Sequence, residues 1–284
     1  MTTFTAVTTI TDWTSITTAA FRTWGKQFSD ALTAVGLAKT SDTGQIDWTT
    51  VTGPTINTYA GYEIRRLSDS IDSTYPIFLK IEYGAGASTS YCAMRISVGH
   101  ASDGAGNLTG WLAANGVIVH GGTGSPSGTG QLSMCRTEGD FWFCHFGQSN
   151  QNGFFSIERR KNQSTGAVAS SGDYRISFLC VIQAVQHYHV TRSTGIIRSE
   201  NTAATCNLVW AALGSGLPGG DVYVSNMYGC FPEIEVMDGV VLYRANELAQ
   251  FSSYTTTLLK SRTYRATGYQ FTATANQYIA GVWE

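Results

Sequence analysis

The amino-acid sequence predicts a mainly β protein, a β-sandwich or barrel-like fold, with one amphipathic helix near the N-terminus. Short apolar or alternating segments recur along most of the chain and are divided by Gly, Ser and Asn, which is typical of strands and turns in such folds. Aromatic residues make up 12% of the chain, with 7 Trp and 14 Tyr, and they favour β structure. Only one segment has helical spacing, and no repeat of about 20–50 residues indicates a solenoid or a propeller.

The helix is predicted within the threonine-rich first part of the chain. Apolar residues recur there three or four positions apart, as in the stripe of an amphipathic helix. Asp12, Thr14 or Ser15 can cap its start, and Gly36 can end it. The stripe either packs against the chain's own sheet or forms an assembly face with neighbouring subunits. The candidate assembly face consists of Ile16, Trp24, Phe28, Leu32 and Val35.

The first predicted strands form a hairpin, after a loop expected over residues 39–61. Residues 75–83 alternate apolar side chains with Lys80 and Glu82, as a half-buried strand does. A glycine-containing turn follows, and residues 92–98 have the pattern of a partner strand.

Further strands are predicted along the rest of the chain. Asp238 and Gly239 stand between two apolar pairs and predict a two-residue hairpin turn, which would join strands 234–237 and 240–243. The other strands are expected at residues 116–120, 131–135, 141–146, 154–159, 175–183, 206–211, 221–224, 254–259 and 277–282.

The amino-acid composition favours some classes of protein function and argues against others. Charged residues make up 13% of the chain, about half the usual fraction, and hydroxyl and amide side chains replace them. Such a surface suits subunits that pack against copies of themselves, because fewer charges lose their water. A net charge of −2 argues against a nucleic-acid partner, which needs clustered Lys and Arg. With no signal peptide and no apolar run near ~18 residues, we expect no membrane insertion.

No motif predicts a catalytic residue, a cofactor or a metal site, so we do not expect an enzyme. His187 and His189 would share one face of a strand, but no carboxylate or cysteine lies at the spacing of a metal motif. The 6 cysteines include no CxxC pair, which argues against zinc and redox motifs. The chain also lacks the spacings of phosphate-binding loops and of nucleophile motifs.

Aromatic residues with polar neighbours are a better functional signal, because rings stack on sugars and anchor protein interfaces. Glu233 and Glu235 are among the carboxylates considered for glycan cleavage, which requires two opposed carboxylates. The candidate surface aromatics are Trp111, Trp142, Tyr188, Tyr223 and Tyr228.

Two stretches of the chain carry a resemblance to a known group of proteins. The first contains FRTWG at residues 21–25 and GLAKTSDTGQIDW at 36–48, and it continues with AGYEI at 60–64 and PIFLKIEYG at 76–84. The second contains VGH, which ends at His100, and DGAGNLTG, which follows it. Over about residues 20–110, the chain resembles structural proteins of tailed-bacteriophage virions. The resemblance carries no catalytic motif.

This resemblance implies a component of a tail, baseplate, neck or fibre, made in the host cytoplasm and located in the virion. An N-terminal helix and attachment segment, residues 1–60, would fix the chain to other virion proteins. A β-rich domain, residues 61–284, would face neighbouring subunits or a host surface glycan. A homo-oligomer is expected, with a trimer favoured. The alternatives are a capsid decoration (cement) protein and a receptor module that binds or cleaves host glycans.

Overall fold

A computed structural model of the chain describes segments that contain one helix and twenty strands. The prediction of a mainly β fold with one N-terminal helix is confirmed. In the described part of the chain, no helix is long and apolar enough to cross a membrane. The described residues are 3–86, 91–109, 117–120, 129–146, 152–159, 161–162, 168, 175–181, 185–191, 197–201, 223–230, 234–244, 253–256, 262–272 and 277–283.

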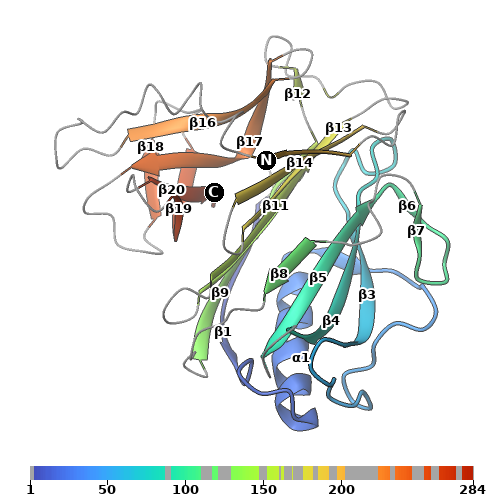
Figure 1. The fold of residues 1–284 in the computed structure, drawn as a ribbon. Coiled ribbons are helices and arrows are strands. Elements are labelled where there is room, and N and C mark those ends of the chain that lie inside the picture. Colours follow the sequence, from blue (N-terminus) through green and yellow to red (C-terminus); the bar gives the residue numbers. More distant parts are fainter. Residues whose placement is uncertain are drawn as a thin grey trace.

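The largest sheet has seven antiparallel strands in the order β1-β9-β10-β11-β13-β14-β15 (Figure 1). β1 comes first in the chain yet pairs with β9 along its whole length, so the N-terminal segment forms one edge of this sheet. The strands are β1 (Phe4–Thr11), β9 (Thr129–Arg136), β10 (Asp140–Phe146), β11 (Asn152–Arg159), β13 (Arg175–Val181), β14 (Val185–Thr191) and β15 (Ile197–Asn201).

A second sheet has five antiparallel strands in the order β2-β3-β4-β5-β8. β6 and β7 pair separately as a short hairpin beyond β5. The bounds are β2 (Leu37–Lys39), β3 (Tyr59–Leu67), β4 (Phe78–Ala85), β5 (Cys92–Gly99), β6 (Ala101–Ser102), β7 (Leu108–Thr109) and β8 (Val117–His120).

The third sheet has six strands, and β17 pairs with β12, β16 and β20 within it. The seven-stranded sheet lies between this sheet and the five-stranded one (Figure 1). The bounds are β12 (Lys161–Asn162), β16 (Tyr223–Cys230), β17 (Ile234–Arg244), β18 (Ser253–Thr256), β19 (Arg262–Thr272) and β20 (Gln277–Val282).

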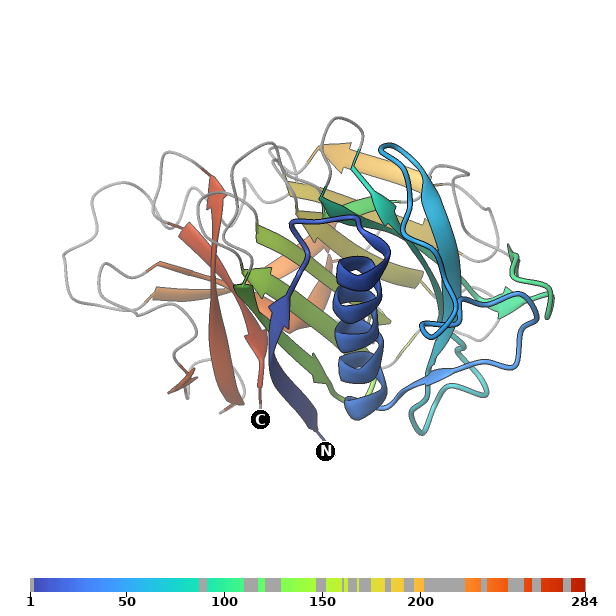
Figure 2. The ribbon, with the colours of Figure 1, turned by 90° about the horizontal axis from the view of Figure 1, so that it is seen from below.

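The helix α1 (Thr18–Ala34) lies between the seven-stranded and the five-stranded sheets (Figure 2). It begins after Thr17, whose carbonyl oxygen accepts the backbone N–H of Phe21 at 2.9 Å, rather than after the caps predicted at residues 12–15. As predicted, it ends at Gly36, whose φ of 79° is accessible to glycine without strain.

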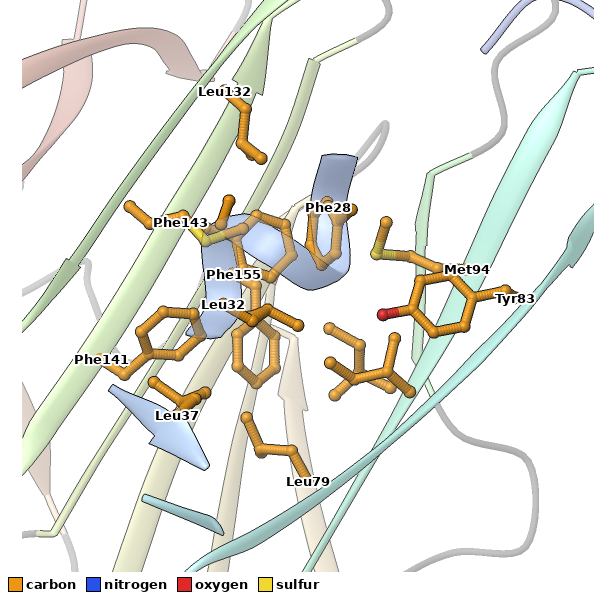
Figure 3. Packing of buried hydrophobic residues seen from close by; sticks show 14 of the residues in the cluster. Phe28, Leu32, Leu37, Leu79, Tyr83, Met94, Leu132, Phe141, Phe143 and Phe155 are labelled. Atoms are coloured by element: carbon orange, nitrogen blue, oxygen red, sulfur yellow. The ribbon is translucent and has the colours of Figure 1, made fainter. Parts of the chain in front are cut away.

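Apolar side chains from the helix and both sheets form one core (Figure 3). The Phe28 ring lies edge-on to Phe143 of β10, with centroids 5.1 Å apart, and edge-on to Tyr83 of β4 at 6.3 Å. Each large side chain buried in this way contributes roughly 1.5–3 kcal/mol. Residues on both sides of the expected boundary at position 60 belong to this core.

Strands β9, β10 and β11 of the seven-stranded sheet have buried side chains on both faces. On β10, Phe141 and Phe143 point into the core with the helix, and Trp142 and Cys144 alternate onto the opposite face. The Trp142 ring lies 5.8 Å from that of Trp283, which follows β20. This double burial explains why the strand has a continuous apolar sequence rather than an alternating one.

Several strand predictions are confirmed, and one turn prediction is wrong. β4 and β5 form the predicted hairpin, with Leu79 opposite Val98. Asp238 and Gly239 do not form a hairpin turn, because they lie inside the continuous strand β17. The pairing of β16 with β17 shifts register there, so these residues belong to an irregularity in the ladder. The strand predicted at 206–211 lies outside the described residues.

The sequence pattern missed the longer strands β1, β3, β14, β15 and β19 and the short strands β2, β6, β7 and β12. Half of the residues of β1 are threonine, and Val7 and Phe4 are partly exposed, so it lacks the apolar run of a buried strand. β3 places the charged side chains of Glu63 and Arg65 on its inner face, the reverse of the usual pattern. In both strands, pairing with neighbours decided a conformation that hydrophobicity did not indicate.

Candidate functional site

The helix residues predicted as an assembly face lie inside the chain's own core, so that prediction is wrong. Trp24, Phe28, Leu32 and Val35 are each at most 1% exposed. Ile16, which precedes the helix, is partly buried against the same core. An apolar stripe shows only that one side of a helix is covered, and here two sheets of the same chain cover it. The alternative, packing against the chain's own sheets, is what the structure shows.

The structure places the predicted surface aromatics in different environments. Trp142 is 1% exposed and stacks on Phe154 with centroids 6.2 Å apart, so it is a core residue and not a surface platform. Tyr188 lies on β14 opposite Phe178 and Ser199, and Tyr223 and Tyr228 lie on β16. Trp111 lies outside the described residues.

The sequence reading did not single out a buried ionic network between the helix and β3. Arg65 donates from Nη2 to Glu63 Oε2 at 2.9 Å, and both side chains are at most 1% exposed. Glu63 Oε1 also accepts hydrogen bonds from Ser29 Oγ at 2.8 Å and from Trp48 Nε1 at 3.2 Å. Tyr83 donates its hydroxyl to Glu63 Oε2 at 3.1 Å. The carboxylate is therefore compensated by donors from the helix, a loop and two strands.

Arg65 in turn connects the helix to the sheet. Its guanidinium donates to Ser29 Oγ at 2.7 Å, to Thr33 Oγ1 at 2.9 Å and to the carbonyl oxygen of Leu37 at 3.0 Å. Ser29 and Thr33 are one turn apart on α1, and Ser29 is buried. Arg65 thus supplies hydrogen-bond donors between the helix and the sheet. An apolar side chain in its place would leave acceptor groups there without these donors.

The charges around Glu63 set its protonation. Burial disfavours its charged form, but the positive charge of Arg65, the hydrogen bonds from Arg65 and Ser29, and the charge of Lys39 together hold the pKa of Glu63 below its usual value. Lys39 Nζ lies 3.4 Å from Glu63 Oε1. Burial, followed by the Glu63 charge, raises the pKa of Tyr83 well above its usual value. The network is therefore a carboxylate and a neutral tyrosine at neutral pH, not a proton-transfer pair.

A second set of buried charges joins the loop after β3 to the turn between β9 and β10. Arg159 of β11 forms an ion pair with Asp69, and both side chains are fully buried. Asp69 Oδ2 also accepts the backbone N–H of Gly139 at 3.1 Å. Arg159 donates from Nε to the carbonyl oxygen of Tyr75. These contacts tie the five-stranded sheet to the seven-stranded one at one end.

Arg136 extends this connection to the helix. Its Nε donates to the carbonyl oxygen of Val35 at 2.8 Å, and its Nη1 donates to that of Ser68 at 2.6 Å. The guanidinium also lies over the Phe4 ring, 4.3 Å from its centroid. A positive group at the C-terminus of a helix satisfies an unpaired carbonyl and complements the helix dipole. The role of Arg136 is therefore structural.

The glycine-rich loop of the β6–β7 hairpin is held together by its own side chains. Asp103 Oδ1 accepts the backbone N–H groups of Ala105 at 2.8 Å and of Asn107 at 3.0 Å. Asp42, from the loop after β2, accepts the N–H of Gly106 at 3.2 Å. The Asn107 side chain also donates to Asp103 Oδ2 at 2.8 Å, and this bond, followed by the two backbone ones, lowers the pKa of Asp103. The carboxylates complete the turn without needing a cation.

The described surface feature best suited to binding is the outer face of the five-stranded sheet. The partly exposed side chains there pair cations with aromatic rings, and we call this set the cation–aromatic face. The pairs, with distances from the cation to the ring centroid, are Arg66 and Phe78 at 5.6 Å, Lys80 and Tyr62 at 4.5 Å, and Arg95 and Tyr59 at 4.6 Å.

Carboxylates complete the charge balance of this face. Arg95 binds Glu82 through two hydrogen bonds, from Nε at 2.7 Å and from Nη2 at 2.8 Å. Arg66 Nε lies 3.1 Å from Asp72 Oδ2. The sequence reading missed these rings, although Lys80 and Glu82 were correctly placed on one side of their strand. The outward residues of β3 could have been found only once β3 was known to be a strand.

Cysteines and histidines give no sign of a reactive or metal site in the described part of the chain. Cys92, Cys135 and Cys144 are free and buried there. Burial raises the pKa of the Cys144 thiol to about 12 and raises those of Cys92 and Cys135 further. Such thiols are protonated and unreactive. No group of three or more metal-binding side chains was found among the described residues.

Comparisons with protein-family models, with curated proteins and with solved structures find no match to this chain. Its function therefore has to be inferred from its own residues.

Proposed function

We propose that this chain is a non-enzymatic structural subunit of a tailed-phage virion, at a tail, baseplate, neck or fibre. The observation that carries the proposal is the use of the buried charges. Glu63, Arg65, Asp69, Arg136 and Arg159 all connect the helix, loops and sheets to one another. Catalytic sites usually direct perturbed charged groups at a cleft, whereas these groups are used to hold layers together.

Two features of the sequence support a role in an assembly. The charge-poor, threonine-rich composition suits surfaces that become buried against other subunits, since few charges must lose water. The resemblance over about residues 20–110 points to virion components. Because the helix stripe is buried within the chain, contacts with other virion proteins have to come from the sheets and their loops.

Mass spectrometry of purified particles tests this proposal. Particles would be collected from lysates of cells that carry the gene and separated on a density gradient. We expect the chain at a fixed copy number per particle, and we expect deletion of the gene to give incomplete or non-infectious particles. Absence of the chain from the particle fraction, with normal particles after deletion, would contradict the proposal. Separating heads from tails on the same gradient distinguishes the tail, neck or fibre role from capsid decoration.

The cation–aromatic face favours a second function, binding of a host surface glycan. Partly exposed tyrosine rings beside cations offer stacking surfaces and hydrogen-bond donors to sugars with acidic groups. Glu82 is engaged by Arg95, so we propose binding rather than cleavage at this face. In a binding assay with acidic envelope polysaccharide, Lys80→Ala should weaken binding at least several-fold, whereas Lys26→Ala on the exposed side of α1 should not. Equal binding by both variants would remove this candidate.

A further inference from the structure

The edge strand β1 lacks the features that usually protect the edge of a sheet. It is the terminal strand of the seven-stranded sheet, and its eight residues pair with β9 without a register shift. Its sequence, FTAVTTIT, contains no charged residue and no proline. Lys, Pro and bulges are the usual means by which proteins keep edge strands from pairing with other chains. An uncharged, regular edge of this length is a template for another strand.

Hydrogen bonding shows which backbone groups of β1 point away from β9. The backbone N–H of Thr11 donates to Gln27 Oε1 of α1 at 2.9 Å, so this residue belongs to the set that faces outward. Because successive residues alternate direction along a strand, Thr5, Val7 and Thr9 face outward as well. Gln27 covers the outward group at one end of the strand, and among the described residues no other strand pairs with the groups before it.

Two of the three exposed large apolar side chains in the described part of the chain lie on β1. They are Val7, 47% exposed, and Phe4, 38% exposed; the third, Ile56, is in a loop before β3. Thr5 and Thr9 flank Val7 on the same face and are also exposed. This face of β1 is therefore a short strip of β-branched side chains, beside a ladder edge that no other described strand pairs with.

The strand is close to a palindrome about Val7, which identifies the partner that fits it. In an antiparallel pair centred on Val7, that residue lies opposite its own copy, and Thr5 lies opposite Thr9. On the other face, Phe4 lies opposite Ile10, whose side chain is fully buried in the core of its own chain. Threonine–threonine pairs and apolar pairs are favourable cross-strand neighbours. A surface that is complementary to itself in this way closes into a two-fold dimer.

We propose that β1 pairs antiparallel with β1 of a second copy of this chain, about a two-fold axis at Val7. The pairing joins the seven-stranded sheets of both copies into one continuous sheet. It rests on the proposed structural role and deepens it, since it names a partner and a contact. It replaces the favoured trimer with a two-fold contact, and trimers or higher assemblies would then need other surfaces.

Engineered cysteines test the register. Directly opposite residues of this kind have Cα atoms about 5.5 Å apart, within disulfide range. Val7→Cys should therefore form a disulfide-linked dimer under mild oxidation. Thr5→Cys puts the two thiols four positions out of register, roughly 13 Å apart along the strands, where no disulfide can form. The unmodified chain, treated alongside, gives the background from native cysteines. Linkage of Thr5→Cys as efficient as that of Val7→Cys would overturn the pairing centred on Val7.

A charge substitution tests the dimer itself. Light scattering of the unmodified chain should show a concentration-dependent dimer. Val7→Lys sets two like charges opposite one another and should make the chain monomeric at concentrations ten-fold or more above the original midpoint. Ile56→Lys makes the same chemical change at an equally exposed site away from the edge and should leave the dimer intact. A monomer at all concentrations, or a trimer that Val7→Lys does not affect, would overturn the proposal.

The two proposals fail in different experiments. A chain found in particles but monomeric in solution, without Val7→Cys linkage in the particles, would retain the virion role and lose the β1 pairing. A dimer that depends on Val7, made by a chain absent from particles, would retain the pairing and lose the virion role.

Discussion

The buried ion pairs Glu63–Arg65 and Asp69–Arg159 stabilise the fold in different ways. The first pair lies within one strand, two residues apart, and donors from the helix, a loop and neighbouring strands surround it. The second pair joins segments 90 residues apart, and Asp69 has backbone N–H groups as its other partners. The comparison shows that the Glu63–Arg65 pair holds the helix against the five-stranded sheet, whereas the Asp69–Arg159 pair connects the five-stranded and seven-stranded sheets at one end.

Removing the arginine of the first pair should have the largest effect. Arg65→Met leaves Glu63 buried without its ion-pair partner and removes the side-chain donor to the carbonyl oxygen of Leu37, so we expect a loss of about 3–5 kcal/mol in the free energy of unfolding. Urea titration measures this loss. The control, Lys26→Met, breaks an exposed pair with Asp30 and should change stability by about 0.5 kcal/mol or less. Similar losses in both variants would show that the buried network contributes nothing particular.

Removing the arginine of the second pair should cost less. In Arg159→Met, Asp69 keeps the N–H groups of Gly139 and Ile71, so we expect a loss on the order of 2–3 kcal/mol. Hydrogen exchange should locate the change in the loop after β3 and the turn before β10. In Arg65→Met the faster exchange should instead lie in α1 and β3. The same exchange pattern in both variants would contradict the distinction between the two pairs.

A close contact beside the first pair predicts a third effect. A Cβ atom on Gly25 of α1 would lie 2.0 Å from Cη2 of Trp48, whose Nε1 donates to Glu63. Alanine favours a helix over glycine by roughly 1 kcal/mol, but the ring has to move. We expect Gly25→Ala to be destabilising by about 1–2 kcal/mol net, because the displaced ring also loses its hydrogen bond. Thermal unfolding measures the sign, and a stabilised variant would show that Trp48 moves freely.

The smallest effect should appear in acid. Since the pKa of Glu63 is lowered in the folded chain, its contribution to stability is complete above the unfolded-state pKa of about 4.3 and is lost as pH falls through the folded value. Unfolding midpoints in urea between pH 7 and pH 3 should therefore fall less steeply for Glu63→Gln than for the original chain. Parallel curves would indicate that other carboxylates account for the acid sensitivity.

Patterns over consecutive residues determined much of the fold in advance. The spacing of Phe28 and Leu32 predicted a helix that ends at Gly36, and the alternation around Lys80 predicted the β4–β5 hairpin. Such patterns can be seen in a short stretch of sequence, because residues three or four apart in a helix, or two apart in a strand, lie on the same face. The same reasoning failed at Asp238 and its glycine, where pairing with two neighbouring strands kept β17 continuous despite a strong turn signal.

Other features were decided only by the tertiary structure. The sequence predicted an apolar side of the helix but not that two sheets of the same chain would cover it. It could not show that Asp69 would meet Arg159, or that Tyr59 would lie under Arg95, because these contacts depend on strand order and register. The sequence by itself determined the mainly β class, the one helix and many of its strands, and a composition poor in charge. The tertiary structure decided which charged groups are buried and which strand edge remains free, because both depend on long-range pairing that local patterns do not encode.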